Sequence, residues 1–144
     1  MIFREATTQD YQGLHEVRIS VNENKLSNPL RITEADYALY LTEKGKGWLC
    51  EIDNRVAGFA IVDTKDNNIW ALFVHPSFEG KGIGKQLQQI MLDWFFAQTK
   101  ETVWLSTGPN TRAEKFYELT GWKKTGVTSD GETKFEMGYA DWAG

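Results

Sequence analysis

One stretch decides how this chain folds: LFVHPSFEGKGIGKQL, residues 72–87. An apolar strand runs into a proline, then into a loop that holds three glycines, and a helix follows directly. The segment after the loop places apolar side chains at helical spacing on one face and polar side chains on the other. The apolar positions are Ile83, Leu87, Ile90, Met91, Trp94 and Phe95. The stretch therefore predicts a strand, a glycine turn and a long amphipathic helix in succession.

The glycine turn at the start of this helix has the properties of an anion site. Backbone N–H groups in the first turn of a helix have no partner within the helix, and the helix dipole makes that end positive. Glycines lack a Cβ, so an anion can approach those N–H groups closely. The turn thus favours a phosphate or pyrophosphate site. A tight turn that needs glycine only for its geometry remains the alternative.

Two phosphate-binding motifs do not fit these glycines. A P-loop requires glycine at the position of Glu79 and serine or threonine at the position of Gln86. A dinucleotide-binding fingerprint requires the spacing G-x-G-x-x-G, whereas Gly80, Gly82 and Gly84 alternate. The sequence therefore argues against a nucleoside triphosphate and against a dinucleotide as the ligand.

Length and composition predict a single domain over residues 1–144. The chain is 41% hydrophobic and 25% charged, which is ordinary for a soluble globular protein. No apolar run approaches the ~20 residues that a membrane span needs, and the N-terminus lacks a secretory signal pattern, so no membrane partner is expected. Cys50 is the only cysteine, so no internal disulfide can form and a cytoplasmic setting is expected.

Charge and histidine content limit the expected partners. The net charge is −4, and the lysines and arginines form no stripe, which disfavours nucleic acid. A modestly negative chain mildly favours cationic small partners such as amines. The two histidines lie far apart and no carboxylate cluster has metal-ligand spacing, so no metal site is expected.

Capping-box spacings and apolar runs predict the remaining elements. The boxes lie at residues 7–10, 33–36 and 111–114, and each opens a helix. The first helix runs to about residue 21, a polar loop at 22–29 follows, and the second helix stops near Gly45 and Gly47. Strands are predicted at residues 2–6, 48–52, 56–62, 69–75 and 102–106, and a hairpin at 122–127 and 133–139.

This order of elements, together with two motifs, resembles the GNAT superfamily of N-acyltransferases. The family's acyl-CoA pyrophosphate loop reads Gln/Arg-x-x-Gly-x-Gly/Ala after a strand that ends in a Val-x-Pro-like segment. Gly82 and Gly84 match it, whereas Glu79 stands where Gln or Arg is usual. A second segment matches in order at Asn110, Ala113, Phe116, Tyr117, Gly121 and Trp122. The resemblance implies an α/β (α+β) GNAT fold, with a mixed central sheet of about six or seven strands and helices on both faces.

The resemblance also implies an acetyl-CoA-dependent N-acetyltransferase. The acceptor would be a primary amine of a small molecule or an amino terminus, which attacks directly in a ternary complex without an acyl-enzyme at Cys50. The strand before the loop would pair with pantetheine where neighbouring strands splay apart, and the loop N–H groups would hold the pyrophosphate. The residues implied in cofactor binding are Leu72, Phe73, Val74, Gly80, Lys81, Gly82, Ile83, Gly84, Lys85 and Asn110.

Tyr117 occupies the family's general-acid position and is the implied catalytic residue. A tyrosine with a pKa near ~10 stays protonated at neutral pH and can donate a proton to the leaving thiolate. Its alternative role is packing, because it shares a helical face with Ala113. Asn110 likewise has an alternative role, as a helix N-cap.

The general base and the acceptor stay open. Many family members carry a glutamate about where Ala71 stands, and alanine cannot accept a proton. The candidate bases are His75, Glu51, Asp63 and Glu132, or a water chain from one of them. Four aromatic residues either wall an acceptor pocket or belong to the core: Tyr37, Tyr40, Trp70 and Trp104.

Two other classes of function fit the sequence less closely. The alanine at position 71 is compatible with a non-catalytic acyl-CoA-binding sensor on the same fold. Trp142 and the aromatic-rich strands are compatible with an interaction module, and hence with a homodimer. A ligand that binds only the native state must stabilise it. Thermal stabilisation by acetyl-CoA would therefore argue against the interaction module.

Overall fold

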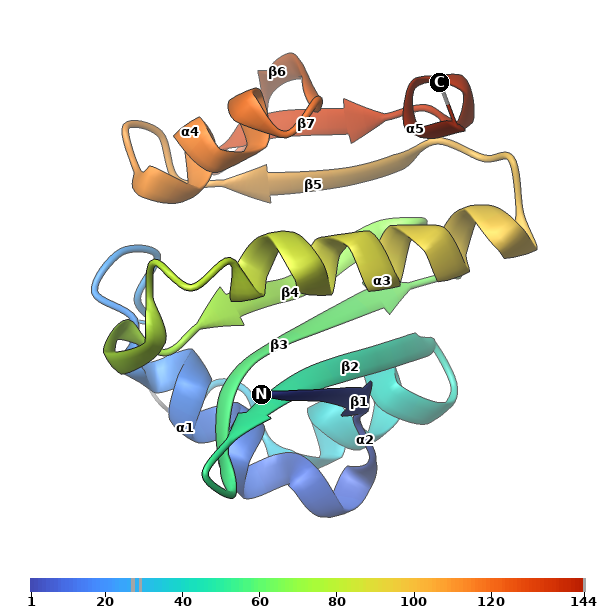
Figure 1. Ribbon diagram of the computed structural model, residues 1–144. Coiled ribbons are helices and arrows are strands. Elements are labelled where there is room, and N and C mark those ends of the chain that lie inside the picture. The colour runs from blue at the N-terminus through green and yellow to red at the C-terminus, as the bar shows by residue number, and fades with distance from the viewer. Residues whose placement is uncertain (27, 29, 144) are drawn as a thin grey trace.

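A seven-stranded mixed sheet forms the centre of the molecule in the computed structural model, which describes residues 1–26, 28 and 30–143 (Figure 1). The strand order is β1-β2-β3-β4-β5-β7-β6, and every neighbouring pair is antiparallel except β4–β5. The predicted mixed sheet is therefore confirmed. The strands are β1 Ile2–Glu5, β2 Gly45–Ile52, β3 Arg55–Asp63, β4 Asn68–Val74, β5 Val103–Thr107, β6 Lys123–Val127 and β7 Thr133–Met137.

Helices cover both faces of the sheet, as predicted. The long helix and α4 lie on one face, and α1 and α2 lie on the other (Figure 1). Two separate apolar clusters fill the spaces between the sheet and these two layers. No helix in the described part of the chain is both long and apolar enough to cross a bilayer. The helices are α1 Tyr11–Ser20, α2 Glu34–Thr42, α3 Ile83–Gln98, α4 Arg112–Leu119 and α5 Tyr139–Ala143.

A helical element begins at each of the three predicted capping sites, but the first of them is a 3₁₀ turn and not an α-helix. Thr33 and Asp36 form a capping box at α2, and the Thr111 hydroxyl accepts a hydrogen bond from a backbone N–H of α4. The box at residues 7–10 opens a short 3₁₀ turn instead, and α1 begins after it at Tyr11. The polar loop predicted at residues 22–29 includes Ser27 and Pro29, which lie outside the described residues.

Helix α2 ends at Thr42, close to the predicted stop near Gly45, but the glycines have another role, and one strand boundary was wrong. Gly45 and Gly47 belong to β2 and do not end α2, because β3 approaches so closely that a Cβ on Gly45 would lie 1.7 Å from the Val62 carbonyl oxygen. The strand predicted to end at residue 139 stops at Met137. Beyond it, α5 places Trp142 on α3, where its indole N–H donates to Asp93 at 3.1 Å.

Strand β4 has two irregularities that shape the cleft beside it. A bulge leaves Trp70 without a partner, since Ile61 pairs with Ala71 and Val62 with Ile69. Trp70 and Ala71 therefore both pack in the cluster under α1 and α2. Between β4 and β5, among the described residues, the only register pair is Asn68–Trp104. The remainder of β4 therefore presents an unpaired edge, as the resemblance implied.

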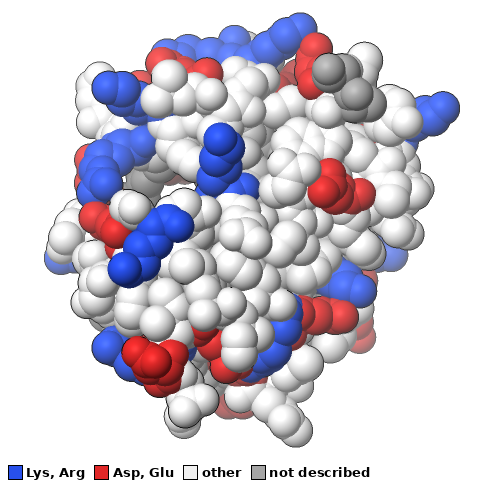
Figure 2. Space-filling view, in the orientation of Figure 1, with Lys and Arg blue, Asp and Glu red and all other residues white. Residues whose placement is uncertain are grey.

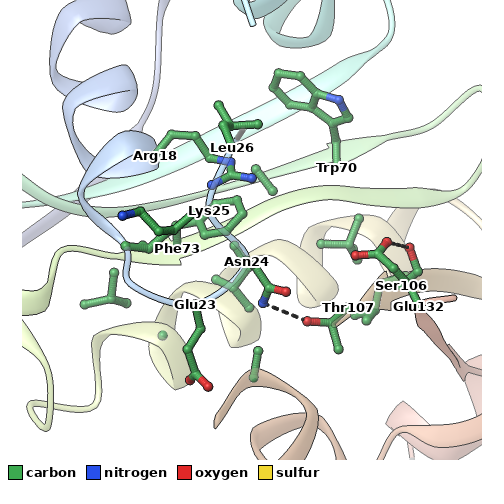
Figure 3. A pocket seen from close by; sticks show the side chains of 18 of the residues that line it. Arg18, Glu23, Asn24, Lys25, Leu26, Trp70, Phe73, Ser106, Thr107 and Glu132 are labelled. Carbon is green, nitrogen blue, oxygen red and sulfur yellow. Dashed lines mark hydrogen bonds between the residues drawn. The ribbon is translucent and has the colours of Figure 1, made fainter. Parts of the chain in front are cut away.

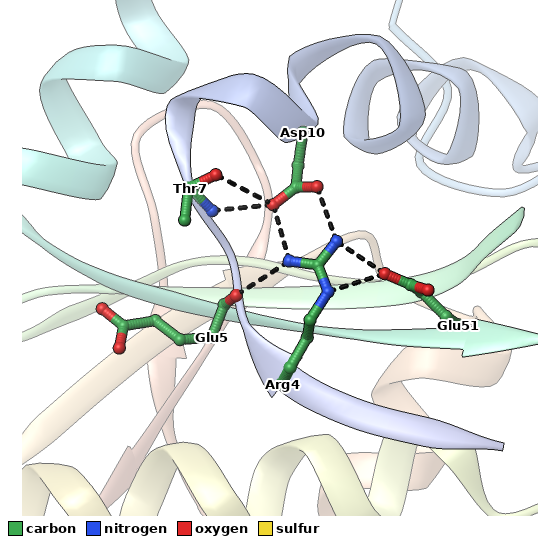
Figure 4. Close-up of polar contacts among 5 residues, drawn as sticks. All are labelled: Arg4, Glu5, Thr7, Asp10 and Glu51. Carbon is green, nitrogen blue, oxygen red and sulfur yellow. Dashed lines mark hydrogen bonds and ion pairs between the residues drawn. The ribbon is translucent and has the colours of Figure 1, made fainter. Parts of the chain in front are cut away.

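Arg4 fixes the N-terminal strand against its surroundings (Figure 4). Its guanidinium donates to both carboxylate oxygens of Asp10, at 2.9 and 2.7 Å, and to Glu51 on β2 at 2.6 Å. The hydrogen bond from Arg4 is the main cause that holds the pKa of Asp10 below its usual range. The arginine thus ties β1 both to its neighbouring strand and to the turn before α1.

Candidate active site

The two diverging strands, β4 and β5, form the walls of the main cleft, with a volume of about 1030 Å³. The start of α3 and one face of α4 line it on one side, and the connection between α1 and α2 lines it on the other (Figure 3). A hollow bordered by lysine and arginine side chains is visible in Figure 2, in the region where Figure 1 places the first turns of α3 and α4. The cleft therefore opens near the first turns of α3 and α4 and runs along β4.

The glycine turn leaves its backbone open at the start of α3. Gly80 and Gly82 have φ values of +77° and +78°, a left-handed conformation that disfavours other residues. A Cβ on either would meet nothing within 4 Å, so the space beside the backbone is empty of protein. Gly82 is the N-cap of α3, whose first N–H groups have no partner within the helix. This geometry fits a phosphate group.

The predicted cofactor-binding residues separate into two groups. Leu72, Phe73, Val74 and Gly84 line the cleft. Gly80, Lys81, Gly82, Lys85 and Asn110 do not line it, and the Ile83 side chain is buried. Asn110 is exposed in a left-handed conformation before α4, and its alternative role as N-cap was wrong, because Thr111 is the cap.

Tyr117 lies in α4 with its ring in the core and reaches the cleft. The ring packs against Trp122 and Phe135, with centroids 5.7 and 5.8 Å apart. Burial raises the pKa of its phenol. The hydroxyl makes no hydrogen bond to a described residue, and Tyr117 is among the residues that line the cleft. Tyr117 therefore both packs and presents a protonated hydroxyl.

The Glu79 side chain reaches from the glycine-containing loop to α4. Its carboxylate accepts a hydrogen bond from Arg112 Nη1 at 2.7 Å. The backbone N–H of Arg112 donates in turn to Glu23, from the α1–α2 connection, at 2.9 Å. The negative charge that departs from the family pattern is thus balanced by an arginine across the cleft opening.

Asn24, in the α1–α2 connection, reaches the end of β5 beside the cleft (Figure 3). Asn24 donates to the Thr107 hydroxyl at 3.1 Å and accepts from the Gly108 N–H at 3.0 Å. These two hydrogen bonds were not predicted from the sequence. The φ of +56° at Asn24 fits the tolerance of asparagine for left-handed backbone, but nothing in the sequence pairs it with residues more than eighty positions away.

Three of the four candidate bases lie away from the cleft. His75 uses its ring to cap the 3₁₀ turn that follows, with Nδ1 accepting a backbone N–H at 3.0 Å. Glu51 belongs to the Arg4 network on β2. Asp63 is buried at the end of β3 and forms an ion pair with Lys44 at 3.2 Å. None of the three lines the cleft.

Glu132 is the candidate base that lines the cleft. It accepts a hydrogen bond from the Ser106 hydroxyl at 2.8 Å, so the β5 wall orients its carboxylate. On the opposite wall, Tyr40 and Trp70 stack at a centroid distance of 4.0 Å and also line the cleft, as does Trp104. Tyr37 is a core residue instead, 1% exposed. Tyr40 and Trp70 thus line one side of the cleft, and Trp104, on β5, lines the other.

Sequence reasoning assigned no functional role to Arg18, a charged residue that lines the cleft. Arg18, on α1, lies over the Phe73 ring with its Cζ 4.2 Å from the centroid. It faces Glu132 and Ser106 from the other side of the cleft (Figure 3). A search of the described residues finds no group of histidine, cysteine or acidic side chains arranged to hold a metal ion.

Comparison with known proteins agrees with this geometry. Residues 8–122 match the model of the acetyltransferase (GNAT) family. An uncharacterized N-acetyltransferase of Mycobacterium bovis is 31% identical over 105 residues, which are 67% of this chain and 65% of the relative. The chain thus spans slightly less than two thirds of that relative's length.

Solved structures share the fold at low sequence identity. The PaiA N-acetyltransferase of Thermoplasma acidophilum, in complex with coenzyme A, has a TM-score of 0.83 and 16% identity, covering 96% of this chain and 98% of that one. A protein from Salmonella typhimurium solved with acetyl-CoA has a TM-score of 0.78 and 16% identity, covering 96% and 94%. With the family match over most of its length, the chain belongs to the GNAT acetyltransferase family.

Proposed function

We propose that this protein transfers an acetyl group from acetyl-CoA to a primary amine by direct attack in a ternary complex. The observation that carries the proposal is the unpaired edge of β4, which leads into an open glycine turn at the start of α3. A strand edge offers main-chain hydrogen bonds to an extended chain such as pantetheine, and the helix start attracts a pyrophosphate. Both features lie along one cleft.

The residues of the cleft divide the chemistry between them. Acetyl-CoA supplies an acetyl group activated as a thioester. Glu132 accepts the proton that the attacking amine loses as the C–N bond forms, directly or through a water. A backbone N–H near Val74 polarises the thioester oxygen, and Tyr117 protonates the thiolate as the C–S bond breaks. The two proton-transfer groups come from the turn before β7 and from α4, and both line the cleft, which is the arrangement that a ternary complex needs.

Glu132 is proposed here in place of the missing glutamate at position 71. Ala71 is buried and offers no proton acceptor. Glu132 lies in the turn directly before β7, and the Ser106 hydroxyl donates a hydrogen bond to its carboxylate at the cleft. The Glu132→Gln variant is therefore expected to lose most of the turnover and to keep its affinity for acetyl-CoA.

The experiment measures acetyl-CoA binding by titration calorimetry and free CoA release with a panel of amines and peptides. The proposal expects binding together with amine-dependent CoA release. Absence of measurable binding would overturn it. Tight binding without turnover for any acceptor would favour the second candidate, an acyl-CoA sensor, to which the buried Ala71 gives its specific support.

A further inference from the structure

Arg18 carries the one fully buried side-chain nitrogen or oxygen that lacks a hydrogen-bond partner within residues 1–26, 28 and 30–143. The atom is Nη1, at the end of a side chain that projects from α1 into the cleft (Figure 3). None of the ion pairs among the described residues includes Arg18. An arginine stays charged in proteins, so this is a partly buried cation without a counter-ion. Such burial is unfavourable unless an anion completes the site.

Charged groups of both signs line the cleft around Arg18. Burial is the main cause that lowers the pKa of Arg18. The Tyr37 phenol and the Glu132 carboxylate raise this pKa, whereas the nearby Arg31 guanidinium lowers it further. Arg31 also lines the cleft. Acidic side chains line both sides of the cleft, Glu23 and Asp36 on the α1–α2 side and Glu132 on the other, but none of the ion pairs among the described residues joins one of them to Arg18.

The position of Arg18 relates it to the acceptor rather than to the phosphates of coenzyme A. Its guanidinium lies on the side chain of Phe73, on the sheet face covered by α1 and α2. The glycine turn leads into α3, which covers the opposite face. The phosphate site and Arg18 thus lie on different sides of β4.

A small apolar recess adjoins the guanidinium. It has a volume of about 90 Å³ and is lined by Arg18, Ile32, Tyr37, Phe59, Trp70, Ala71 and Phe73. The recess lies where the β4 bulge turns both Trp70 and Ala71 to this face. The small side chain at position 71 leaves room there for an apolar group.

From these features we infer that the acceptor is a small amine that also carries a carboxylate, such as an apolar amino acid. Its carboxylate binds the planar fork of Arg18, which matches two carboxylate oxygens. Its amine faces the thioester and Glu132, and its apolar side chain enters the recess. The inference rests on the proposed function, and it names the substrate class for the same site.

The first test compares acceptors that differ only in the carboxylate: leucine, leucinamide and 3-methylbutylamine, each with acetyl-CoA. The wild type is expected to favour leucine in kcat/KM. Arg18→Gln is expected to lower kcat/KM for leucine by roughly 10- to 100-fold, the usual effect of losing a charged hydrogen bond. The other two acceptors should change little. Arg55→Gln, which removes an exposed arginine paired with Glu16, is the control and should affect none of them.

Three outcomes of this comparison would overturn the inference. One is a wild type that uses 3-methylbutylamine as well as leucine. Another is an Arg18→Gln variant that slows all three acceptors equally, which would indicate a structural role. The last is an Arg18→Gln variant whose main defect is acetyl-CoA affinity by calorimetry, which would assign the guanidinium to the cofactor.

A second test uses stability and does not depend on turnover. Arg18→Met replaces an unpartnered buried charge by an apolar side chain that fits the same space, so Tm is expected to stay equal or to rise. A large fall in Tm would show that Arg18 is needed for folding, and it would count against a binding role.

A third test separates failure of the inference from failure of the proposed function. If acetyl-CoA binds but no acceptor is turned over, N-acetylleucine is titrated into the CoA complex of the wild type and of Arg18→Gln. Binding to the wild type that Arg18→Gln loses would support the carboxylate site even then. No binding, or equal binding to both, would overturn it, whereas the acetyl-CoA titration alone decides the cofactor part of the proposed function.

Discussion

Arg112 donates a hydrogen bond of 2.7 Å to the carboxylate of Glu79, and this contact joins the loop before α3 to the first turn of α4. Both side chains are largely exposed, 74% for Arg112 and 41% for Glu79. The pair therefore lies in water-accessible surroundings at the opening of the cleft. An anion that binds at the glycine turn would meet the carboxylate and its arginine together.

Glu79→Gln is expected to tighten acetyl-CoA binding a few-fold. The change removes a negative charge beside the proposed pyrophosphate site and leaves Arg112 without its carboxylate partner. Because exposed charges are screened by salt, the gain should be larger at low ionic strength than at high. Calorimetry at two salt concentrations measures it, with Glu101→Gln, an exposed residue elsewhere, as control. Weaker binding by Glu79→Gln would show instead that the carboxylate is needed to brace the loop.

Gly84→Ala is expected to raise stability and to weaken acetyl-CoA binding. Gly84 is inside α3, where alanine is favoured over glycine by about 0.5–1 kcal/mol. A Cβ there would make an ordinary contact, 3.6 Å from Val74, and Gly84 lines the cleft where a phosphate must come close. Affinity should fall roughly tenfold, equivalent to about 1.4 kcal/mol.

Gly82→Ala provides the matched comparison, because Gly82 has a φ of +78°. Alanine in that left-handed conformation costs about 1 kcal/mol, so this variant should unfold at a lower temperature than the wild type. Thermal denaturation and calorimetry on both variants test the pair. Unchanged affinity in both would mean that the turn does not hold the pyrophosphate.

The local parts of this structure could be predicted from the sequence. The strand, glycine turn and amphipathic helix follow from spacing alone, and the capping boxes place helix starts because their partners are three residues apart. The inner cleft could not be predicted in this way. Arg18 over Phe73, and Asn24 on Thr107, join residues far apart in the chain, and no periodic pattern records such contacts. The role of Gly45 could not be predicted for the same reason, because the need for glycine there comes from the close approach of β3.

Asp10→Asn is expected to reduce the free energy of unfolding at pH 7 by about 1 kcal/mol, a value that allows for the partial exposure of Arg4. The pKa of Asp10 is lowered in the folded protein, mainly by the hydrogen bond from Arg4. The contribution of the Asp10 carboxylate to the free energy of unfolding is therefore complete above the ordinary pKa of about 3.9. It is lost as the pH falls through the lowered pKa of the folded protein.

Urea unfolding of the wild type and Asp10→Asn at pH 7, 4 and 3 tests this dependence. The difference between the two should shrink as the pH falls, while Glu101→Gln, without a side-chain partner among the described residues, should follow the wild type throughout. A difference that stays constant down to pH 3 would contradict the assignment to the Asp10 charge.

Tyr117→Phe is expected to lower kcat by roughly a hundredfold, the usual contribution of a positioned general acid, with little change in acetyl-CoA affinity. Stability should also change little, because the hydroxyl makes no hydrogen bond to a described residue and the ring keeps its packing. Burial raises the pKa of Tyr117, so the phenol stays protonated through the neutral range. The kcat profile should therefore show no loss from its ionisation below its ordinary pKa of about 10.

The raised pKa of Tyr117 also predicts how the stability of the protein changes at alkaline pH. Between the ordinary and the raised pKa the folded state holds a proton that the unfolded state has lost, so stability should fall as pH rises above about 10. In Tyr117→Phe this part of the fall should disappear. Tyr139→Phe, which replaces a half-buried tyrosine of α5 outside the cleft, is the control for kcat and should leave it unchanged. If Tyr117→Phe kept the wild-type kcat while Glu132→Gln lost it, the thiolate would take its proton from water, and Tyr117 would serve only to pack α4 against the sheet.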